Sequence, residues 1–260
     1  MDRLLLEMRP GRKSHKGQNG VVLIIGGSKT YHGAPILAAR AAVRFCDLVY
    51  FASTKENNAL VQRMKLSTAN VICVPKGRLG FALAHATCVL VGNGMDADAK
   101  TGAITAKILK SGKRCVIDAA ALRVMRRLLP LLHKDVILTP HAREFESAFG
   151  IPASEANAAA MAKKYGCTIL LKGERDLVAF PGKAVHVKGG NAGMTKGGTG
   201  DVLAGLCAAL FSRCDDPLRA AYTASRLNKR AGELLYKHYH YNFSSEDLAD
   251  ELAYAAVHMP

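Results

Sequence analysis

A glycine-rich segment between residues 189 and 200 has the residue types of an anion-binding loop. It ends in Gly198-Thr199-Gly200 and runs into Asp201–Phe211, an apolar stretch that predicts a buried helix. The first backbone N–H groups of a helix have no partner within it, and glycines let an anion approach them closely. A phosphate group is therefore the expected ligand of this loop.

Asp201 places a negative charge in a loop that should attract anions. Because this charge would repel an anionic ligand, we expect Asp201 to have a specific role. It could cap the helix, or it could take a proton from a hydroxyl beside a phosphoryl group in transfer. Four glycines within Gly193–Gly200 favour the second role. A Walker A loop is not the explanation, because Ser28 stands before Lys29-Thr30 where that motif requires glycine.

Short apolar runs rich in β-branched residues alternate with Ala- and Leu-rich segments along the chain. The predicted strands are Gly20–Ile25, Leu48–Ala52, Val71–Val74, Cys88–Val91, Arg114–Ile117, Val136–Thr139, Thr168–Lys172, Leu177–Ala179 and Ala184–His186. The predicted helices are Ala34–Phe45, Asn57–Met64, Lys100–Lys110, Ala119–Leu131, Ala142–Phe149, Ser154–Tyr165, Asp201–Phe211, Pro217–His238 and Ser245–Val257.

This alternation predicts a mostly parallel sheet with helices on both faces, followed by an antiparallel meander after Thr168. In such sheets, ligands bind beyond the carboxyl ends of the strands. The glycines and polar clusters of this sequence stand in the loops that follow strands, where we expect the functional residues.

Length and composition restrict the class of protein. A chain of 260 residues suits one α/β domain, which we expect to span residues 1–260. The apolar runs are shorter than the ~20 residues that cross a bilayer, and residues 1–7 lack the pattern of a signal peptide, so we expect a cytoplasmic protein. Seven cysteines without CxxC spacing indicate buried thiols and argue against a zinc site or a disulfide framework.

The net charge of +15 favours anionic ligands without choosing between a nucleotide and a nucleic acid. The basic residues are scattered, and the chain contains no Trp, so a nucleic-acid-binding protein remains a weaker alternative.

Four further segments each follow a predicted strand. They are Gly26–Pro35, Gly92–Asp96, Thr139–Phe145 and Lys172–Asp176. Together with Gly-Thr-Gly-Asp, and in this order, they resemble the NAD(P)H-hydrate dehydratases, a branch of the ribokinase-like superfamily. The resemblance covers most of the chain and implies a ribokinase-like three-layer α/β/α fold with a mostly parallel central sheet.

The resemblance also implies a function. Such enzymes are carbon–oxygen lyases of metabolite repair that return hydrated NADH or NADPH to NADH or NADPH. ADP or ATP, with Mg²⁺, phosphorylates the ring hydroxyl, and loss of phosphate restores the ring. The implied partners are therefore the hydrate and the adenine nucleotide, with neither nucleic acid nor membrane, and the family tends toward homo-oligomers such as tetramers.

The resemblance assigns roles to individual positions. Asp201 is implied as the catalytic base, and Glu144, three residues after His141 in a helical turn, as a water-mediated ligand of Mg²⁺. The implied substrate-binding residues are Ala34, Gly94, Asp118, His141 and Asp201. The implied nucleotide-binding residues are Lys172, Gly173, Glu174, Arg175, Asp176, Gly198, Thr199 and Gly200.

Simpler roles stay open for some of these positions. Gly92 could serve only a tight turn, His141 could cap a helix, and Lys172 could be a solvated strand end. Asp96 stands where relatives often have a third glycine, and Asp176 stands where the nucleotide turn commonly ends in Thr. The second departure leaves the choice between ATP and ADP open.

The alternative enzyme is a ribokinase-like kinase of a small alcohol of the hydroxyethylthiazole or hydroxymethylpyrimidine type. Gly200-Asp201 supports both enzymes equally, whereas Gly26–Pro35 and Thr139-Pro140-His141 favour the dehydratase. Many bacterial relatives carry an N-terminal epimerase domain, and the first motif here stands too near residue 1 to leave room for one.

Overall fold

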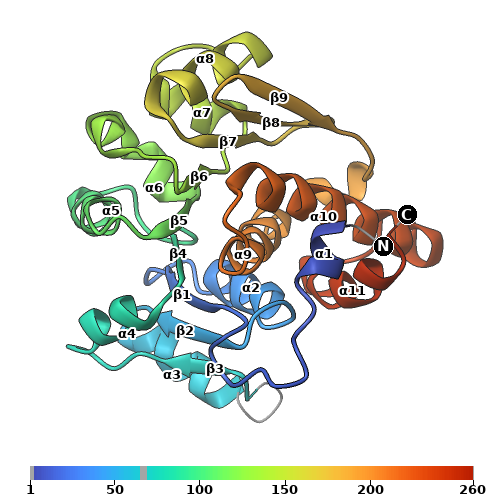
Figure 1. Ribbon diagram of the computed structural model, residues 1–260. Coiled ribbons are helices and arrows are strands. Elements are labelled where there is room, and N and C mark those ends of the chain that lie inside the picture. The colour runs from blue at the N-terminus through green and yellow to red at the C-terminus, as the bar shows by residue number, and fades with distance from the viewer. Residues whose placement is uncertain (1–2, 65–68, 260) are drawn as a thin grey trace.

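The computed structural model describes residues 3–64 and 69–259. Nine strands form one sheet in the order β3-β2-β1-β4-β5-β6-β7-β8-β9 (Figure 1). All pairs from β3 to β7 are parallel. The strands are β1 Val21–Ile25, β2 Leu48–Ala52, β3 Val71–Cys73, β4 Cys88–Val91, β5 Arg114–Ile117, β6 Val136–Leu138, β7 Thr168–Leu171, β8 Asp176–Phe180 and β9 Lys183–Val187.

Two groups of helices cover the two faces of the sheet, which confirms the predicted three-layer fold (Figure 1). One face carries α2 Gly33–Ala42, α9 Thr199–Phe211, α10 Pro217–Tyr239 and α11 Ser245–Val257. The other carries α4 Leu79–His85, α5 Ala99–Lys110, α6 Ala119–Arg123, α7 Ala142–Phe149 and α8 Glu155–Tyr165. The remaining helices are α1 Arg3–Glu7, beside α10, and α3 Lys55–Met64, beside β3. None of the helices in the described ranges is both long and apolar enough to cross a membrane.

The direction of chain growth reverses at the centre of the sheet. From β1 the chain first adds β2 and β3 on one side, then returns to add β4 and all later strands on the other. The crevice at such a reversal, beyond the carboxyl ends of the strands, is where α/β sheets bind ligands. Here it lies between the loops that follow β1 and β4. The predicted antiparallel meander is confirmed in β7, β8 and β9.

The strands divide the hydrophobic core into two halves, because successive side chains point to opposite faces. In β4, Leu90 faces the α9 side, whereas Val89 and Val91 face the α5 side. On the first side, α9 is buried over the whole of Val202–Phe211. A helix that is apolar all round belongs in the interior, and α9 indeed lies between α2, α10 and the sheet (Figure 1).

The prediction of one helix over Ala119–Leu131 is wrong. Helix α6 ends at Arg123, and two 3-10 turns follow at Met125–Arg127 and Leu129–Leu131. Pro130 lies in the second turn. It has no N–H to donate and disfavours helical geometry in the residue before it, so a continuous α-helix cannot pass through this point. Two short helices, α1 and α4, were not predicted, and a 3-10 turn at Ala192–Thr195 precedes α9.

Helices α2 and α9 approach each other closely at Gly205. A Cβ atom at this position would overlap the backbone of Ala38. Because backbone cannot move aside as a flexible side chain can, Gly205 sets the separation of the two helices and thereby the position of the first turn of α9.

Gly205→Ala should lower the free energy of unfolding by about 1–3 kcal/mol, the usual cost of overfilling a packed core. Gly102→Ala in α5 is the matched control, because its Cβ would meet no atom within 4 Å. Gly102→Ala should leave stability unchanged or raise it by up to about 1 kcal/mol through helix propensity. Urea unfolding of the two variants measures the difference, and equal stabilities would contradict this account.

Candidate active site

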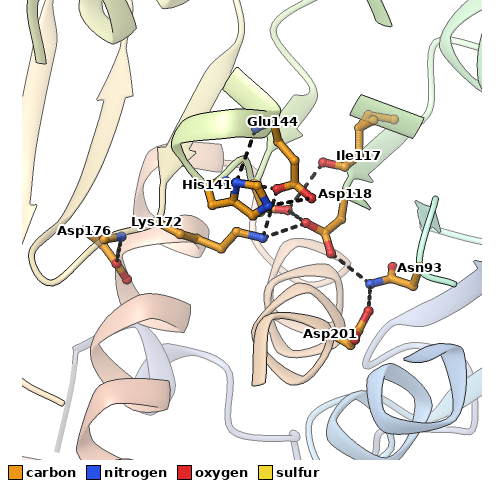
Figure 2. Close-up of polar contacts among 10 residues, drawn as sticks. Asn93, Ile117, Asp118, His141, Glu144, Lys172, Asp176 and Asp201 are labelled. Carbon is orange, nitrogen blue, oxygen red and sulfur yellow. Dashed lines mark hydrogen bonds and ion pairs between the residues drawn. The ribbon is translucent and has the colours of Figure 1, made fainter. Parts of the chain in front are cut away.

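Polar side chains from three strand ends and two helices meet beside the sheet reversal (Figure 2). The loops after β4, β5 and β7 and the first turns of α7 and α9 each contribute. The side chains are those of Asn93, Asp118, Lys172, His141, Glu144 and Asp201. Residues separated by more than a hundred positions in sequence thus form one contiguous network.

Asp118 and Lys172 form the buried ion pair of this network. Lys172 Nζ lies 2.9 Å from Asp118 Oδ1, and the side chains are only 17% and 3% exposed, respectively. Thr139 Oγ1 donates to the same carboxylate oxygen at 2.8 Å. Burial lowers the pKa of Lys172, but the carboxylates of Asp118 and Glu144 outweigh it and hold this pKa above its usual value. Lys172 is therefore a fixed cation and not a solvated strand end.

The backbone around Asp118 is in an unusual conformation. Ala119 has φ 48°, a left-handed value that L-residues rarely adopt. On the other side, Gly92 has φ 122°, and a Cβ atom there would overlap the carbonyl oxygen of Asp118. The glycine therefore allows the loops after β4 and β5 to touch. Such local strain is typical of functional sites, where the rest of the fold holds it in place.

Asp201 lies in the first turn of α9 and is partly buried. Its Oδ1 accepts a hydrogen bond from Asn93 Nδ2 at 2.6 Å. Burial and the negative charge of Asp118 raise the pKa of Asp201 to about 6, against the lowering effects of Asn93 and Lys172. A carboxylate whose pKa lies near neutrality can accept and release a proton under physiological conditions.

His141 and Glu144 cap the N-terminus of α7 reciprocally. Glu144 N donates to His141 Nδ1 at 3.3 Å, and His141 N donates to Glu144 Oε2 at 2.9 Å. Because Nδ1 accepts from an N–H group, the proton of a neutral ring is on Nε2. A backbone bridge between His141 and Lys172 brings the Glu144 carboxylate within 3.6 Å of Lys172 Nζ. The capping role left open for His141 is thus present, and its ring remains half exposed.

The glycine loop fixes the N-terminus of α9. Gly198 has φ 95°, and a Cβ atom there would overlap Leu37 of α2. Thr199 Oγ1 donates to Met194 O at 2.7 Å and to Lys196 O at 2.9 Å, so this side chain closes the loop rather than facing the site. Gly200 lies at the site, because a Cβ atom there would be 3.5 Å from Lys172 Nζ.

The turn between β7 and β8 is held from behind by α10. Asp176 Oδ1 accepts from Gly173 N at 2.9 Å, and Asp176 Oδ2 accepts from Ser225 Oγ at 2.7 Å. Lys229 Nζ donates to Glu174 O at 3.0 Å and lies 3.5 Å from Asp176 Oδ1. The Asp176 side chain is therefore buried and points away from Asp201 (Figure 2), whereas the side chains of Glu174 and Arg175 are exposed.

Two predicted substrate positions lie against each other at the reversal of the sheet. A Cβ atom at Gly94 would be 3.1 Å from the Cβ of Ala34 and 3.0 Å from Tyr31 O. Gly94 also has φ 68°, which favours glycine. The loops after β1 and β4 therefore touch at this point.

Sequence reasoning missed four residues of these networks. Asn93 lies between two glycines of its motif, and the resemblance assigned a role only to a glycine. Thr139 precedes a proline and a histidine, and the resemblance assigned a role only to the histidine. Ser225 and Lys229 are far from any motif, and only the packing of α10 against β7 and β8 brings them to the turn. The signal that could have found the first two is a polar residue within two positions after a buried strand.

The donor set of the site bears on its fit to Mg²⁺. The carboxylates of Asp118, Glu144 and Asp201 face the ammonium of Lys172, and their combined negative charge exceeds its positive charge. Within the described residues, no three His, Cys, Asp or Glu side chains form a group that could hold a metal ion alone. This arrangement fits Mg²⁺, which prefers oxygen, keeps several waters and shares its shell with substrate phosphates.

Comparison with known proteins agrees with this geometry. The family model of the NAD(P)H-hydrate dehydratases matches residues 22–253. The ADP-dependent (S)-NAD(P)H-hydrate dehydratase of Nitrosopumilus maritimus is 36% identical over 276 residues, which cover 96% of this chain and 93% of the relative. A bifunctional NAD(P)H-hydrate repair enzyme of Methanocaldococcus jannaschii is 38% identical over 245 residues, 92% of this chain, which spans only 48% of that relative.

Among solved structures, a ribokinase-like superfamily protein from Enterococcus faecalis superposes with a TM-score of 0.88 at 25% sequence identity. The match covers 98% of this chain and 93% of that one. Fold, sequence and family model agree, and the chain belongs to the NAD(P)H-hydrate dehydratase family.

Proposed function

We propose that this site dehydrates hydrated NADH or NADPH with an adenine nucleotide as the phosphoryl donor and Asp201 as the base. The observation that carries the proposal is the position of Asp201, a carboxylate with a raised pKa at the tip of the buried helix α9. Family membership over residues 22–253 favours this reaction over phosphorylation of a vitamin precursor.

In the first step Asp201 removes the proton from the ring hydroxyl as its oxygen attacks the terminal phosphorus of the nucleotide. Oδ1 is engaged by Asn93, so Oδ2 is the oxygen that we assign to the proton. The bond between the terminal phosphorus and its bridging oxygen breaks, and the shortened nucleotide leaves with the electron pair.

In the second step the new phosphate ester leaves the ring carbon. The ring nitrogen supplies electrons as the C–O bond breaks, and loss of a proton from the adjacent carbon restores the double bond. Inorganic phosphate, the shortened nucleotide and NADH or NADPH are the products. The hydroxyl is thereby lost as part of phosphate, which is a better leaving group than hydroxide.

Negative charge on the migrating phosphoryl group requires donors that are already in place. We assign this role to Lys172 and to the backbone N–H groups at the start of α9. The Lys172 ammonium is fixed by Asp118 and lies beside Gly200, so both kinds of donor face the same point. We place the rest of the nucleotide along the turn Lys172–Asp176, and ADP is the nucleotide named for the similar Nitrosopumilus protein.

We assign Glu144 to Mg²⁺, which it would bind through a water molecule. Its carboxylate lies 3.6 Å from Lys172 Nζ, in the first turn of α7. The ion would neutralise charge on the phosphates of the nucleotide.

The proposed function is tested by incubating the protein with hydrated NADH or NADPH, Mg²⁺ and either ADP or ATP. Absorbance at 340 nm should rise with at least one nucleotide and should stay flat without any. A flat trace with both nucleotides and both hydrates would refute the proposal.

Asp201→Asn should reduce kcat by about 10²–10⁴-fold, the usual effect of losing a general base. The amide can still accept from Asn93, so nucleotide binding measured by calorimetry should stay close to wild type. Near-normal turnover in this variant would remove Asp201 from the mechanism.

Asp201 also makes the stability of the wild-type protein depend on pH, and Asp201→Asn removes this dependence. Because the folded pKa of Asp201 is raised to about 6, the folded state binds its proton more tightly than the unfolded state. Its favourable contribution is therefore present at low pH and is lost as the pH rises through about 6. Asp201→Asn should gain stability relative to wild type between pH 5 and pH 8, by about 1 kcal/mol after allowance for solvent screening. Parallel urea unfolding at the two pH values measures this gain.

The wild-type profile of kcat/KM against pH should show an acid limb near pH 6, with activity rising as the pH increases. The reason is that only ionised Asp201 can accept the proton, and its pKa is about 6. A limb at pH 4, the range of an ordinary aspartate, would contradict this assignment.

Gly200→Ala should raise the KM for the nucleotide by about tenfold or more with little loss of stability. The added methyl group would point toward Lys172 at 3.5 Å, into the space that we assign to a phosphate. Gly197→Ala in the same loop is the control, because its Cβ would meet no atom within 4 Å. If both variants changed KM equally, the phosphate would not lie at Gly200.

A further inference from the structure

Asn93 joins two carboxylates that would otherwise repel each other (Figure 2). Its Nδ2 donates to Asp118 Oδ2 at 2.9 Å and to Asp201 Oδ1 at 2.6 Å. The residue is fully buried. An amide NH₂ group has two N–H bonds, so each carboxylate receives one of them.

The backbone of Asn93 is held independently of its side chain. Its carbonyl oxygen accepts from Gly27 N at 2.7 Å. A Cβ atom at Gly26 would lie 2.5 Å from the same oxygen, so this close approach also depends on glycine. The amide therefore cannot follow one carboxylate away from the other, and it acts as a fixed spacer between them.

The other end of the amide is not satisfied. Asn93 Oδ1 is buried and has no hydrogen-bond partner among the residues that the structure describes. Turning the amide round would direct this oxygen at two carboxylates, which is worse, so the observed orientation is the favoured one. A buried acceptor without a partner lowers stability. The orientation of the Asn93 amide is therefore explained by its hydrogen bonds to the two carboxylates and not by the packing of the loop.

The groups that act on Asp201 come from several elements. Burial favours its protonated form, as do the charges of Asp118 after β5 and Glu144 in α7, whereas Lys172 after β7 opposes them. Lys172 is already paired with Asp118. On the α2 side, α9 meets the backbone of Ala38, which carries no charge. The hydrogen bond from Asn93 is therefore the direct contact that lowers the pKa of Asp201.

We propose that Asn93 is a positioning residue that holds Asp201 as a carboxylate and aims its second oxygen at the acceptor hydroxyl. This inference rests on the proposed function. It adds a residue that acts on the reaction through Asp201. Asn93 is fully buried behind the two carboxylates, so we expect it not to contact the substrate.

Asn93→Leu tests the inference, because leucine has a similar size and shape but cannot donate. Loss of the hydrogen bond should move the acid limb of kcat/KM to higher pH by about one unit. Above the limb, activity should return to within about tenfold of wild type. A purely structural role would instead lower activity equally at every pH and leave the limb in place.

Asn58→Leu is the matched control. Asn58 also donates from Nδ2, to Val74 O at 3.2 Å, and also has a buried Oδ1 without a partner, but it lies in α3 away from Asp201. Its substitution should change the Tm and leave the limb unmoved. Asn93→Ser, whose hydroxyl can donate one hydrogen bond, should give an intermediate limb and also serves if the leucine variant does not fold.

The outcomes separate the two proposals. An inactive wild-type protein would refute the proposed function. An active wild-type protein whose limb is unchanged in Asn93→Leu and Asn93→Ser would refute the role of Asn93 alone.

Discussion

Repulsion between carboxylates is the constraint on which this site depends. Asp118, Glu144 and Asp201 gather in a largely buried region, where burial and the charges of the other two carboxylates raise the pKa of Asp201. The ammonium of Lys172, the amide of Asn93 and the hydroxyl of Thr139 offset the repulsion. At Asp201 these groups do not outweigh burial and the nearby negative charges, so its carboxylate is protonated at a higher pH than an ordinary aspartate. The pKa of about 6 at Asp201 therefore follows first from burial and then from the neighbouring negative charges.

The conformation of the backbone, as well as the choice of side chains, positions the charged groups of the site. The polar groups stand at the carboxyl ends of parallel strands, which places them at one edge of the sheet. Gly26 and Gly92 then let the loops after β1, β4 and β5 approach one another closely, and Gly198 lets the start of α9 approach Leu37 of α2. The strained φ of Ala119 completes the same arrangement around Asp118. Precision in the site therefore depends on the packing of the surrounding loops.

Most of the sheet could be predicted from the sequence, because buried parallel strands are short apolar runs. The runs Leu48–Ala52, Cys88–Val91 and Arg114–Ile117 match the observed strands at both ends. The failures have local causes. Pro130 interrupted a region that was apolar enough to predict a helix, and α4, with a glycine near its start, was too short to give a periodic signal.

The site was predictable in its parts but not in its connections. Motif positions after strands identified Asp118, Lys172 and Asp201, and the sheet brought them together. The contacts that decide protonation, such as those of Asn93, could not be read from spacing, because they depend on the register of strands far apart in sequence. The same holds for Ser225 and Lys229, which reach the β7–β8 turn through the packing of a distant helix.

The contacts that Ser225 and Lys229 of α10 make with the β7–β8 turn also affect ligand binding. Lys229 and Ser225 hold Asp176 and the carbonyl groups of the turn, along which we propose that the nucleotide binds. Ordering of this segment therefore takes place when the chain folds, and its entropic cost does not enter the binding equilibrium. A turn that is ordered in this way would lose little conformational freedom on binding a ligand.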